Sequence, residues 1–138
     1  LQIQKLTPDA KLPTYAHATD AGMDLYAAAE TTVAPGTRAL VGTGIAMAIP
    51  AGYVGLVWDK SGLAAKAGVT TFAGVIDAEY RGEISVVVYN SGDVTHTFRA
   101  GEKVAQLLVQ PVAHPELIEV ADLDATTRGS GGFGSTGR

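Results

Sequence analysis

The stretch EISVVVY at residues 83–89, followed by NSGD at 90–93, decides the fold class of this chain. Ile84, Val86 and Val88 alternate with the residues between them, as in a strand whose side chains point to the two faces of a sheet in turn. Both sets are largely apolar, so we expect both faces of this strand to be covered. The Asn-Ser-Gly-Asp sequence predicts a hairpin turn directly after it.

Segments of similar character recur along the chain between glycine- and proline-containing turns. We predict strands at residues 2–6, 31–33, 43–49, 53–58, 83–89, 95–98 and 103–112. Helical character is confined to 61–67, where we expect Ser61 to be the N-cap. Many short strands joined by tight turns are typical of a sandwich or barrel. The predicted fold class is therefore all-β, as a sandwich or a jelly-roll-like β-barrel.

Length and composition limit the domain organisation. The chain has 138 residues, which suits one hydrophobic core and is too short for two ordinary domains. From residue 126 the sequence is rich in Gly, Ser and Thr and has almost nothing to bury. We therefore predict a core at residues 1–125 and a flexible C-terminal tail at residues 126–138.

Several classes of protein are disfavoured by composition. Cysteine does not occur, which excludes disulfides and thiolate metal sites. The net charge of -4 argues against a bulk nucleic-acid or membrane binder. We find no apolar run that could span a bilayer and no signal-peptide pattern, so we expect a cytoplasmic location. The histidines His17, His96 and His114 lack metal-ligand spacing, and we interpret them as structural or surface residues.

Five segments are unusual for a plain β-sandwich, and two of them place charges near apolar residues or a helix start. AGMDL at 21–25 puts Asp24 in an apolar segment, where a carboxylate without partners is costly to bury. DKSGLA at 59–64 precedes an expected helix, and the free amides of a helix start suit phosphate oxygens. The structural alternatives are an aspartate bonded to turn amides and an ordinary capped turn.

The third segment is the densest cluster of polar and aromatic residues. AGVIDAEYRGE at 73–83 combines glycines, an acid, an aromatic residue and an Arg-Gly turn. We expect a β-hairpin here that exposes backbone donors and acceptors to a planar base and holds Asp77 near a water. The structural alternative is an acidic hairpin tip with Tyr80 packed on it.

The last two segments lie near the C-terminus. In GEKVAQL at 101–107, the amide of Gln106 needs hydrogen-bond partners, unless it is a sheet-edge residue that faces water. In residues 128–136, glycines permit a nest of amides around an anion, and Arg128 offers a planar donor for phosphate. Phe133 has no core to join in this Gly/Ser sequence, but it can stack on a base. The alternative for this segment is a disordered linker.

Taken together and in this order, the five segments resemble the five motifs of the trimeric dUTPase family, over nearly the whole chain. The resemblance implies a jelly-roll subunit in a homotrimer with active sites at the subunit interfaces. Motif three would come from one subunit, motifs two and four from a neighbour, and the tail from the third. The implied activity is magnesium-dependent hydrolysis of dUTP to dUMP and pyrophosphate. That reaction keeps uracil out of DNA and supplies dUMP for thymidylate synthesis. No nucleic-acid or membrane partner is expected.

The resemblance also implies roles for individual residues. Asp77 is expected to be the general base that orients the attacking water, with the Tyr80 ring under the sugar. The backbone of Gly74, Val75 and Ile76 would pair with uracil. The further substrate-binding residues that it implies are Lys60, Ser61, Gly62, Thr71, Ser85, Gln106, Arg128, Phe133, Gly134, Ser135 and Thr136.

The implied metal is Mg²⁺, bound through triphosphate oxygens and waters without direct side-chain ligands, as suits an ion that keeps its waters. Asp24 would hold one of those waters. The chain departs from the family pattern at Lys60 and Lys103, where Arg is common, so the planar fork is lost at both positions. Thr71 stands where some members carry Asn, so uracil recognition would rest more on the backbone.

Two other functions stay open at this stage. A dCTP deaminase has a related fold, but that family uses a catalytic Glu where this chain has Asp77. The other function is that of a nucleotide-sensing or protein-binding module that kept the fold and lost turnover. The combination of Asp77, Tyr80, Arg128 and Phe133 argues against it.

Overall fold

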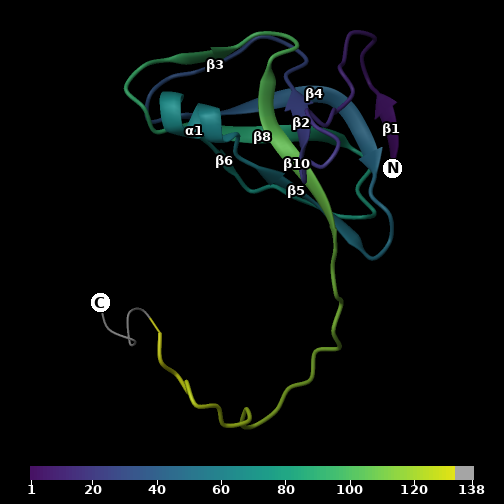
Figure 1. Cartoon of the computed structure of the whole chain (residues 1–138), viewed down its shortest axis with the longest axis vertical. Coiled ribbons are helices and arrows are strands. Elements are labelled where there is room, and N and C mark those ends of the chain that lie inside the picture. Colours follow the sequence, from purple (N-terminus) through teal and green to yellow (C-terminus); the bar gives the residue numbers. More distant parts are fainter. Residues whose placement is uncertain (133–138) are drawn as a thin grey trace.

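In the computed structural model, which describes residues 1–132, the chain forms antiparallel β-sheets and one short helix (Figure 1). The strands are β1 (Gln2–Lys5), β2 (Met23–Tyr26), β3 (Thr31–Val33), β4 (Arg38–Ala48), β5 (Tyr53–Trp58), β6 (Val69–Phe72), β7 (Val75–Ile76), β8 (Glu83–Asn90), β9 (His96–Phe98) and β10 (Lys103–Pro111). The helix α1 spans Ser61–Ala67. The all-β, jelly-roll prediction is confirmed.

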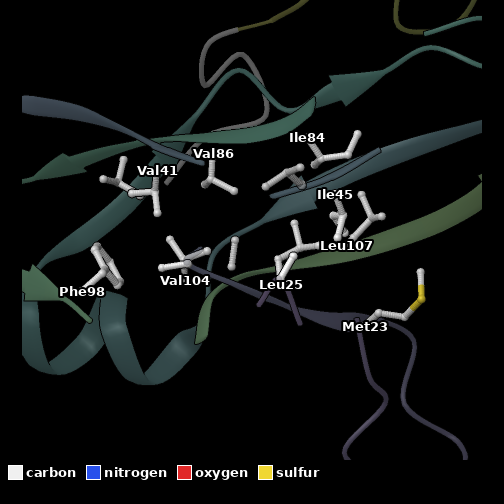
Figure 2. Packing of buried hydrophobic residues seen from close by; sticks show 14 of the residues in the cluster. Met23, Leu25, Val41, Ile45, Ile84, Val86, Phe98, Val104 and Leu107 are labelled. Atoms are coloured by element: carbon white, nitrogen blue, oxygen red, sulfur yellow. The ribbon is translucent and has the colours of Figure 1, made fainter. Parts of the chain in front are cut away.

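The core lies between two four-stranded sheets, with strand orders β1-β4-β8-β6 and β2-β10-β5-β7, while β3 and β9 form a small third sheet. Apolar side chains from both large sheets meet in one cluster (Figure 2). From the first sheet come Val41, Ile45, Ile84 and Val86, and from the second come Leu25, Val104 and Leu107. This packing of inward-facing alternate residues is the usual way in which two sheets share a core.

Strand β8 has one buried face and one that is only partly covered. Ile84, Val86 and Val88 are buried, as the alternation predicts. The opposite face, which includes Val87, stays partly exposed, so the expectation of two covered faces does not hold within one chain. Val87 lies in register between Leu40 of β4 and Phe72 of β6, and both of these are exposed. An apolar row therefore crosses the outer face of this sheet.

Two predicted hairpins are wrong, because consecutive strands enter different sheets. The turn after β8 leads to β9, which pairs with β3 and not with β8. Asn90 explains this exit, because its buried side chain donates to the carbonyls of Val33 and Val94. Similarly, β7 pairs with β5 in one sheet while β8 belongs to the other, so residues 73–83 cross between sheets.

Strands β2 and β6 were not predicted, and β4 begins at Arg38, before the predicted start at residue 43. The pairing of β4 with β8 shifts register between Gly42 and Ala46, which breaks the alternation that a sequence reading relies on. Helix α1 has the predicted bounds, but Ser61 is its first helical residue and not its cap. The N-cap is Lys60, with no side-chain cap hydrogen bond.

The chain leaves the body after β10 as an extended segment, residues 112–132, which we call the C-terminal arm (Figure 1). Leu117 and Leu123 of the arm are 92% and 86% exposed. The arm begins before residue 126, so the predicted division falls within it and stays a prediction. In residues 1–132, α1 is far too short to cross a bilayer, and no helix qualifies as a membrane span. The cytoplasmic location also stays a prediction.

Candidate active site

Asp24 is buried and pairs with two lysines. It lies in β2, next to the central strand β10, and is 5% exposed. Lys60 donates to its Oδ1, and the Nζ of Lys103 lies 2.6 Å from its Oδ2. Burial opposes ionisation of Asp24, but the hydrogen bonds and charges of Lys103 and Lys60 outweigh it and lower the pKa of the carboxyl. An ion pair between Lys103 and Asp24 is thus present, although Lys103 lacks the planar fork of an arginine.

Asp59 lies directly after β5 and forms hydrogen bonds with residues of β6 and β10. Its carboxylate accepts hydrogen bonds from the hydroxyl of Thr70 at 2.7 Å and from the N–H and hydroxyl of Thr71 at 2.6 Å each. Its backbone carbonyl accepts a hydrogen bond from Nε2 of Gln106 at 2.9 Å. No role is predicted for Asp59 from the sequence, and the next residue, Lys60, donates to Asp24.

Gln106 is not a sheet-edge residue. Its strand, β10, lies between β2 and β5, and Gln106 pairs with Asp24 on one side and Trp58 on the other. Its amide also covers Gly22, where an added Cβ would lie 2.6 Å from Oε1 of Gln106. Gln106, in the fourth unusual segment, therefore contacts Gly22 of the first segment and Asp59 of the second. These three segments meet at one place.

Ser61 and Gly62 are exposed at the start of α1. Lys60 provides the N-cap through its backbone, and its carbonyl accepts hydrogen bonds from the amides of Leu63 and Ala64. A Cβ at Gly62 would meet nothing within 4 Å, so the space beside this turn is open. The turn thus offers a hydroxyl and open backbone to a ligand from outside the chain.

Asp77 is exposed in a compact turn that follows β7. The carbonyl of Asp77 accepts a hydrogen bond from the N–H of Tyr80 at 3.1 Å. The guanidinium of Arg81 donates to the carbonyls of Ala78 and Tyr80, at 2.7 and 2.9 Å. The Tyr80 hydroxyl donates to the carbonyl of Glu83 at 3.0 Å. These bonds fix the backbone that carries the Asp77 carboxylate.

The side of this turn forms an open, mostly apolar cleft of about 730 Å³. The residues that line it include Asp77, Tyr80, Tyr53, Val75 and His114. Tyr53 and His114 were missed as site residues, because nothing in the sequence links the start of β5 or the arm to residues 75–80. Only the pairing of β5 with β7 and the exit of β10 bring them there.

A second cavity of about 320 Å³ lies at the turn between β6 and β7. Trp58, Asp59, Thr71 and Gly74 line it, with Ala73 between the last two. Ala73 has φ 60°, which non-glycine residues rarely adopt, and Gly74 has φ 119°. The carbonyl of Gly74 accepts a hydrogen bond from the N–H of Val57 at 2.8 Å. The backbone of this turn is therefore held in an uncommon, well-defined shape.

One chain does not bring all the predicted site residues together. Asp77 follows Ile76, whose partner Gly55 lies near the start of β5, whereas Lys60 and Ser61 follow the end of β5. At about 3.3 Å per residue, the two ends of this strand lie roughly 16 Å apart. The two halves of the predicted site are therefore separated within one subunit.

Other predicted site residues lie apart from both halves or outside the described residues. Ser85 lies on the partly exposed face of β8, in register with Gly42. Arg128 is in the arm and donates from Nε to the carbonyl of Gly131 at 2.8 Å. The residues predicted to clamp the nucleotide from the tail, Phe133, Gly134, Ser135 and Thr136, lie outside residues 1–132.

The side chains suit a metal ion that is held mainly by a ligand. Within residues 1–132, no three His, Asp or Glu side chains gather into a metal site. Asp24 is already paired on both oxygens, although each carboxylate oxygen can accept a further hydrogen bond. Asp24 can therefore still accept a hydrogen bond from a metal-bound water, and its role toward the metal stays a prediction.

Comparisons with known proteins agree on one family. A family model described as dUTPase matches residues 8–137. The deoxyuridine 5'-triphosphate nucleotidohydrolase of Mycolicibacterium gilvum is 50% identical and is aligned over 99% of this chain and 94% of its own. The probable deoxyuridine 5'-triphosphate nucleotidohydrolase of Schizosaccharomyces pombe is 47% identical, over 98% and 96%.

Solved structures give the same result. The dUTPase of Staphylococcus bacteriophage 80alpha with dUPNHPP superimposes with a TM-score of 0.94 and 30% identity, over 99% of this chain and 98% of that one. A mutant dUTPase from phage phi11 of S. aureus, described with a structural Mg(II) ion, gives a TM-score of 0.82 and 30% identity, over 88% and 96%.

Proposed function

The chain belongs to the dUTPase family and is a dUTP nucleotidohydrolase, and we propose that a water held by Asp77 attacks the α-phosphorus of dUTP. The observation that carries this assignment is the placement of Asp77 and Tyr80 on one cleft, beside Val75 of β7. A rigid turn presents an exposed carboxylate to that cleft, next to an aromatic ring and backbone groups. The family match favours dUTP hydrolysis over both dCTP deamination and a module without turnover.

In the proposed reaction, Asp77 accepts a proton from the water and orients its oxygen in line with the bond to be broken. The oxygen forms a new bond to the α-phosphorus, and the bond between that phosphorus and the bridging oxygen of the β-phosphate breaks. The products are dUMP and pyrophosphate. Phosphoryl transfer of this kind depends mainly on positioning and charge neutralisation, because the protein itself forms no covalent bond.

Base and sugar recognition would come from the same segment as Asp77. The backbone at half-buried Gly74 and exposed Val75 suits the fixed donors and acceptors of uracil, and such a site rejects the mismatched cytosine amine. Tyr80 is 44% exposed and lies beside Asp77, so its ring can pack against the deoxyribose and leave no room for a 2'-hydroxyl.

Mg²⁺ is the proposed cofactor, and when bound it would neutralise the triphosphate and fix its geometry. The chain's own contribution there is to supply positive charge and hydroxyls. Lys60 and Ser61 lie at the start of α1, where the phosphates are proposed to bind. Gln106 would contact phosphate oxygens or their waters, because its Nε2 donates to the carbonyl of Asp59 and so lies at the turn that leads into α1.

We also propose a homotrimer. The separation of Asp77 from Ser61 along β5 supports this, because a second copy can supply the half that is distant within one chain. The apolar row Leu40, Val87 and Phe72 offers a surface for such contact, with Leu40 63% exposed. The arm extends away from its own body, as an arm that serves a neighbour would (Figure 1).

The test is a pyrophosphate-release assay with dUTP, dCTP, dTTP and UTP, with and without Mg²⁺. We expect dUTP to be cleaved far faster than the others, and only with the metal. Asp77→Asn should lose about two orders of magnitude or more in rate while still binding nucleotide. Glu79→Gln, which changes the neighbouring carboxylate on the same cleft, is the matched control. Near-normal turnover by Asp77→Asn would remove Asp77 from the mechanism.

A further inference from the structure

We propose that Asp59 is a positioning residue that sets base selectivity, by clamping Thr71 ahead of the turn between β6 and β7. This inference rests on the proposed function, in which the backbone of Gly74, in that turn, and of Val75, directly after it, reads the base. Asp59 itself would contact neither the base nor the phosphates. It would act only through the backbone that it holds.

The clamp consists of three short hydrogen bonds to two consecutive residues. One carboxylate oxygen of Asp59 accepts from both the N–H and the hydroxyl of Thr71, and the other accepts from the hydroxyl of Thr70. These contacts stabilise the carboxylate enough to lower the pKa of Asp59, although its partial burial opposes ionisation. The side chain is thus a charged acceptor at neutral pH, and charge-assisted hydrogen bonds are the stronger kind.

The clamp replaces a missing strand neighbour. β6 is the edge strand of the order β1-β4-β8-β6, so among residues 1–132 its outer N–H groups have no partner strand. Asp59 satisfies the N–H of Thr71 on that open edge. Without the carboxylate, this end of β6 would be held from one side only, through its pairing with β8.

Thr71 lies directly before the part of the chain whose shape matters for the base. Two residues later, Ala73 has φ 60°, a left-handed conformation that is unfavourable for an L-residue with a Cβ. The carbonyl of Gly74 then accepts a hydrogen bond from the N–H of Val57 in β5. The turn is therefore fixed at one end by Asp59 and at the other by β5, and loss of either anchor lets Ala73 relax. A displacement of about 1 Å at such a site can change rates up to about 100-fold.

The experiment compares Asp59→Ala, Asp59→Asn and Thr71→Val with wild type and with Asp93→Ala, an exposed acid that takes no part in these hydrogen bonds. The readout is the ratio of kcat/KM for dUTP to that for dCTP. Asp59→Ala removes all three hydrogen bonds, and we expect the ratio to fall about tenfold or more. Thr71→Val removes one of the three, and we expect a smaller fall.

Asp59→Asn separates geometry from charge. The amide oxygen can still accept both hydrogen bonds of Thr71, and the amide nitrogen can donate to the hydroxyl of Thr70. We therefore expect Asp59→Asn to keep most of the selectivity that Asp59→Ala loses. Equal losses in the two variants would show that Asp59 acts by its charge near Lys60, and would overturn the clamp.

A second readout does not depend on turnover. Hydrogen exchange of residues 69–76 in the intact protein should become faster in Asp59→Ala and stay near wild type in Asp59→Asn. If wild type fails to cleave dUTP, the proposed function is wrong and the exchange data still test the clamp. If wild type is active and Asp59→Ala keeps both its selectivity and its exchange protection, only the clamp is wrong. Should Asp59→Ala fail to fold, an unchanged ratio in Thr71→Val would overturn it.

Discussion

Replacing Gly74 with alanine should destabilise the protein and damage base recognition together. Gly74 has φ 119°, outside the range that a residue with a Cβ adopts without strain. The added Cβ would also lie 2.8 Å from the carbonyl oxygen of Val57, a backbone atom that cannot swing away. We expect the backbone strain to lower the free energy of unfolding by about 1–3 kcal/mol. The forced contact should add about 1–3 kcal/mol more.

Gly36→Ala is the matched control, because it isolates the strain of positive φ. Gly36 has φ 70°, and a Cβ there would meet nothing within 4 Å. We expect it to cost about 1–2 kcal/mol. The difference between the two variants, roughly 2 kcal/mol, corresponds to a difference of roughly 5–10 °C in Tm for a chain of this length.

Urea unfolding and thermal scans at one fixed protein concentration measure this difference, because an oligomer's Tm depends on concentration. The kcat/KM for dUTP, measured at a temperature where both variants are folded, should fall in Gly74→Ala and not in Gly36→Ala. Equal stability and equal activity in the two variants would refute the reasoning, since they would show that the contact with Val57 does not constrain the turn.

The arm, the metal and the ion pairs of Asp24 each lead to a further test. Deletion after Ala125 should leave a folded protein with little activity, measured by circular dichroism and pyrophosphate release; full activity would show that residues 126–138 are not needed. Chelation of Mg²⁺ should abolish turnover and leave Tm nearly unchanged, because within residues 1–132 no cluster of side chains is arranged to hold the ion; a large fall in Tm would contradict this. The pKa of Asp24 is lowered in the folded state, so its stabilising contribution is present above the ordinary value of 3.8 and is lost as pH falls through the lower folded value. The difference in unfolding free energy between wild type and Asp24→Asn should therefore be constant from about pH 5 to 8 and shrink below about pH 4; a difference that grew in acid would mean that the lysine pairs do not stabilise the fold.

Strands with clear alternation could be predicted from sequence, and those without it could not. β5 has the predicted bounds, and β8 differs by one residue at its end. β2 was missed because its first three residues, including Asp24, are all buried, which leaves no alternation to read. The pairing of strands could not be predicted from the sequence either, since β7, β8 and β9 follow one another in the chain but lie in three different sheets.

The candidate site shows the same limit. An acid in an apolar segment signalled that Asp24 needs a partner, but Lys60 lies 36 residues away and could not be identified as that partner from spacing. Asp59 lies in the unusual segment at 59–64, but its partners Thr70 and Thr71 could not be predicted, because these hydrogen bonds depend on β6 folding back beside the end of β5. Motif resemblance could point to Asp77 and Tyr80, whereas Tyr53 and His114 reach the same cleft only through strand pairing.

The course of the C-terminal arm has a genetic consequence. An arm that extends away from its own body can be covalently part of one copy while it works for another. Two defective chains, one carrying Asp77→Asn and one ending at Ala125, would then each supply what the other lacks. Refolded as a mixture, they would regain turnover that neither regains alone, so a cell expressing both damaged alleles would keep part of the activity.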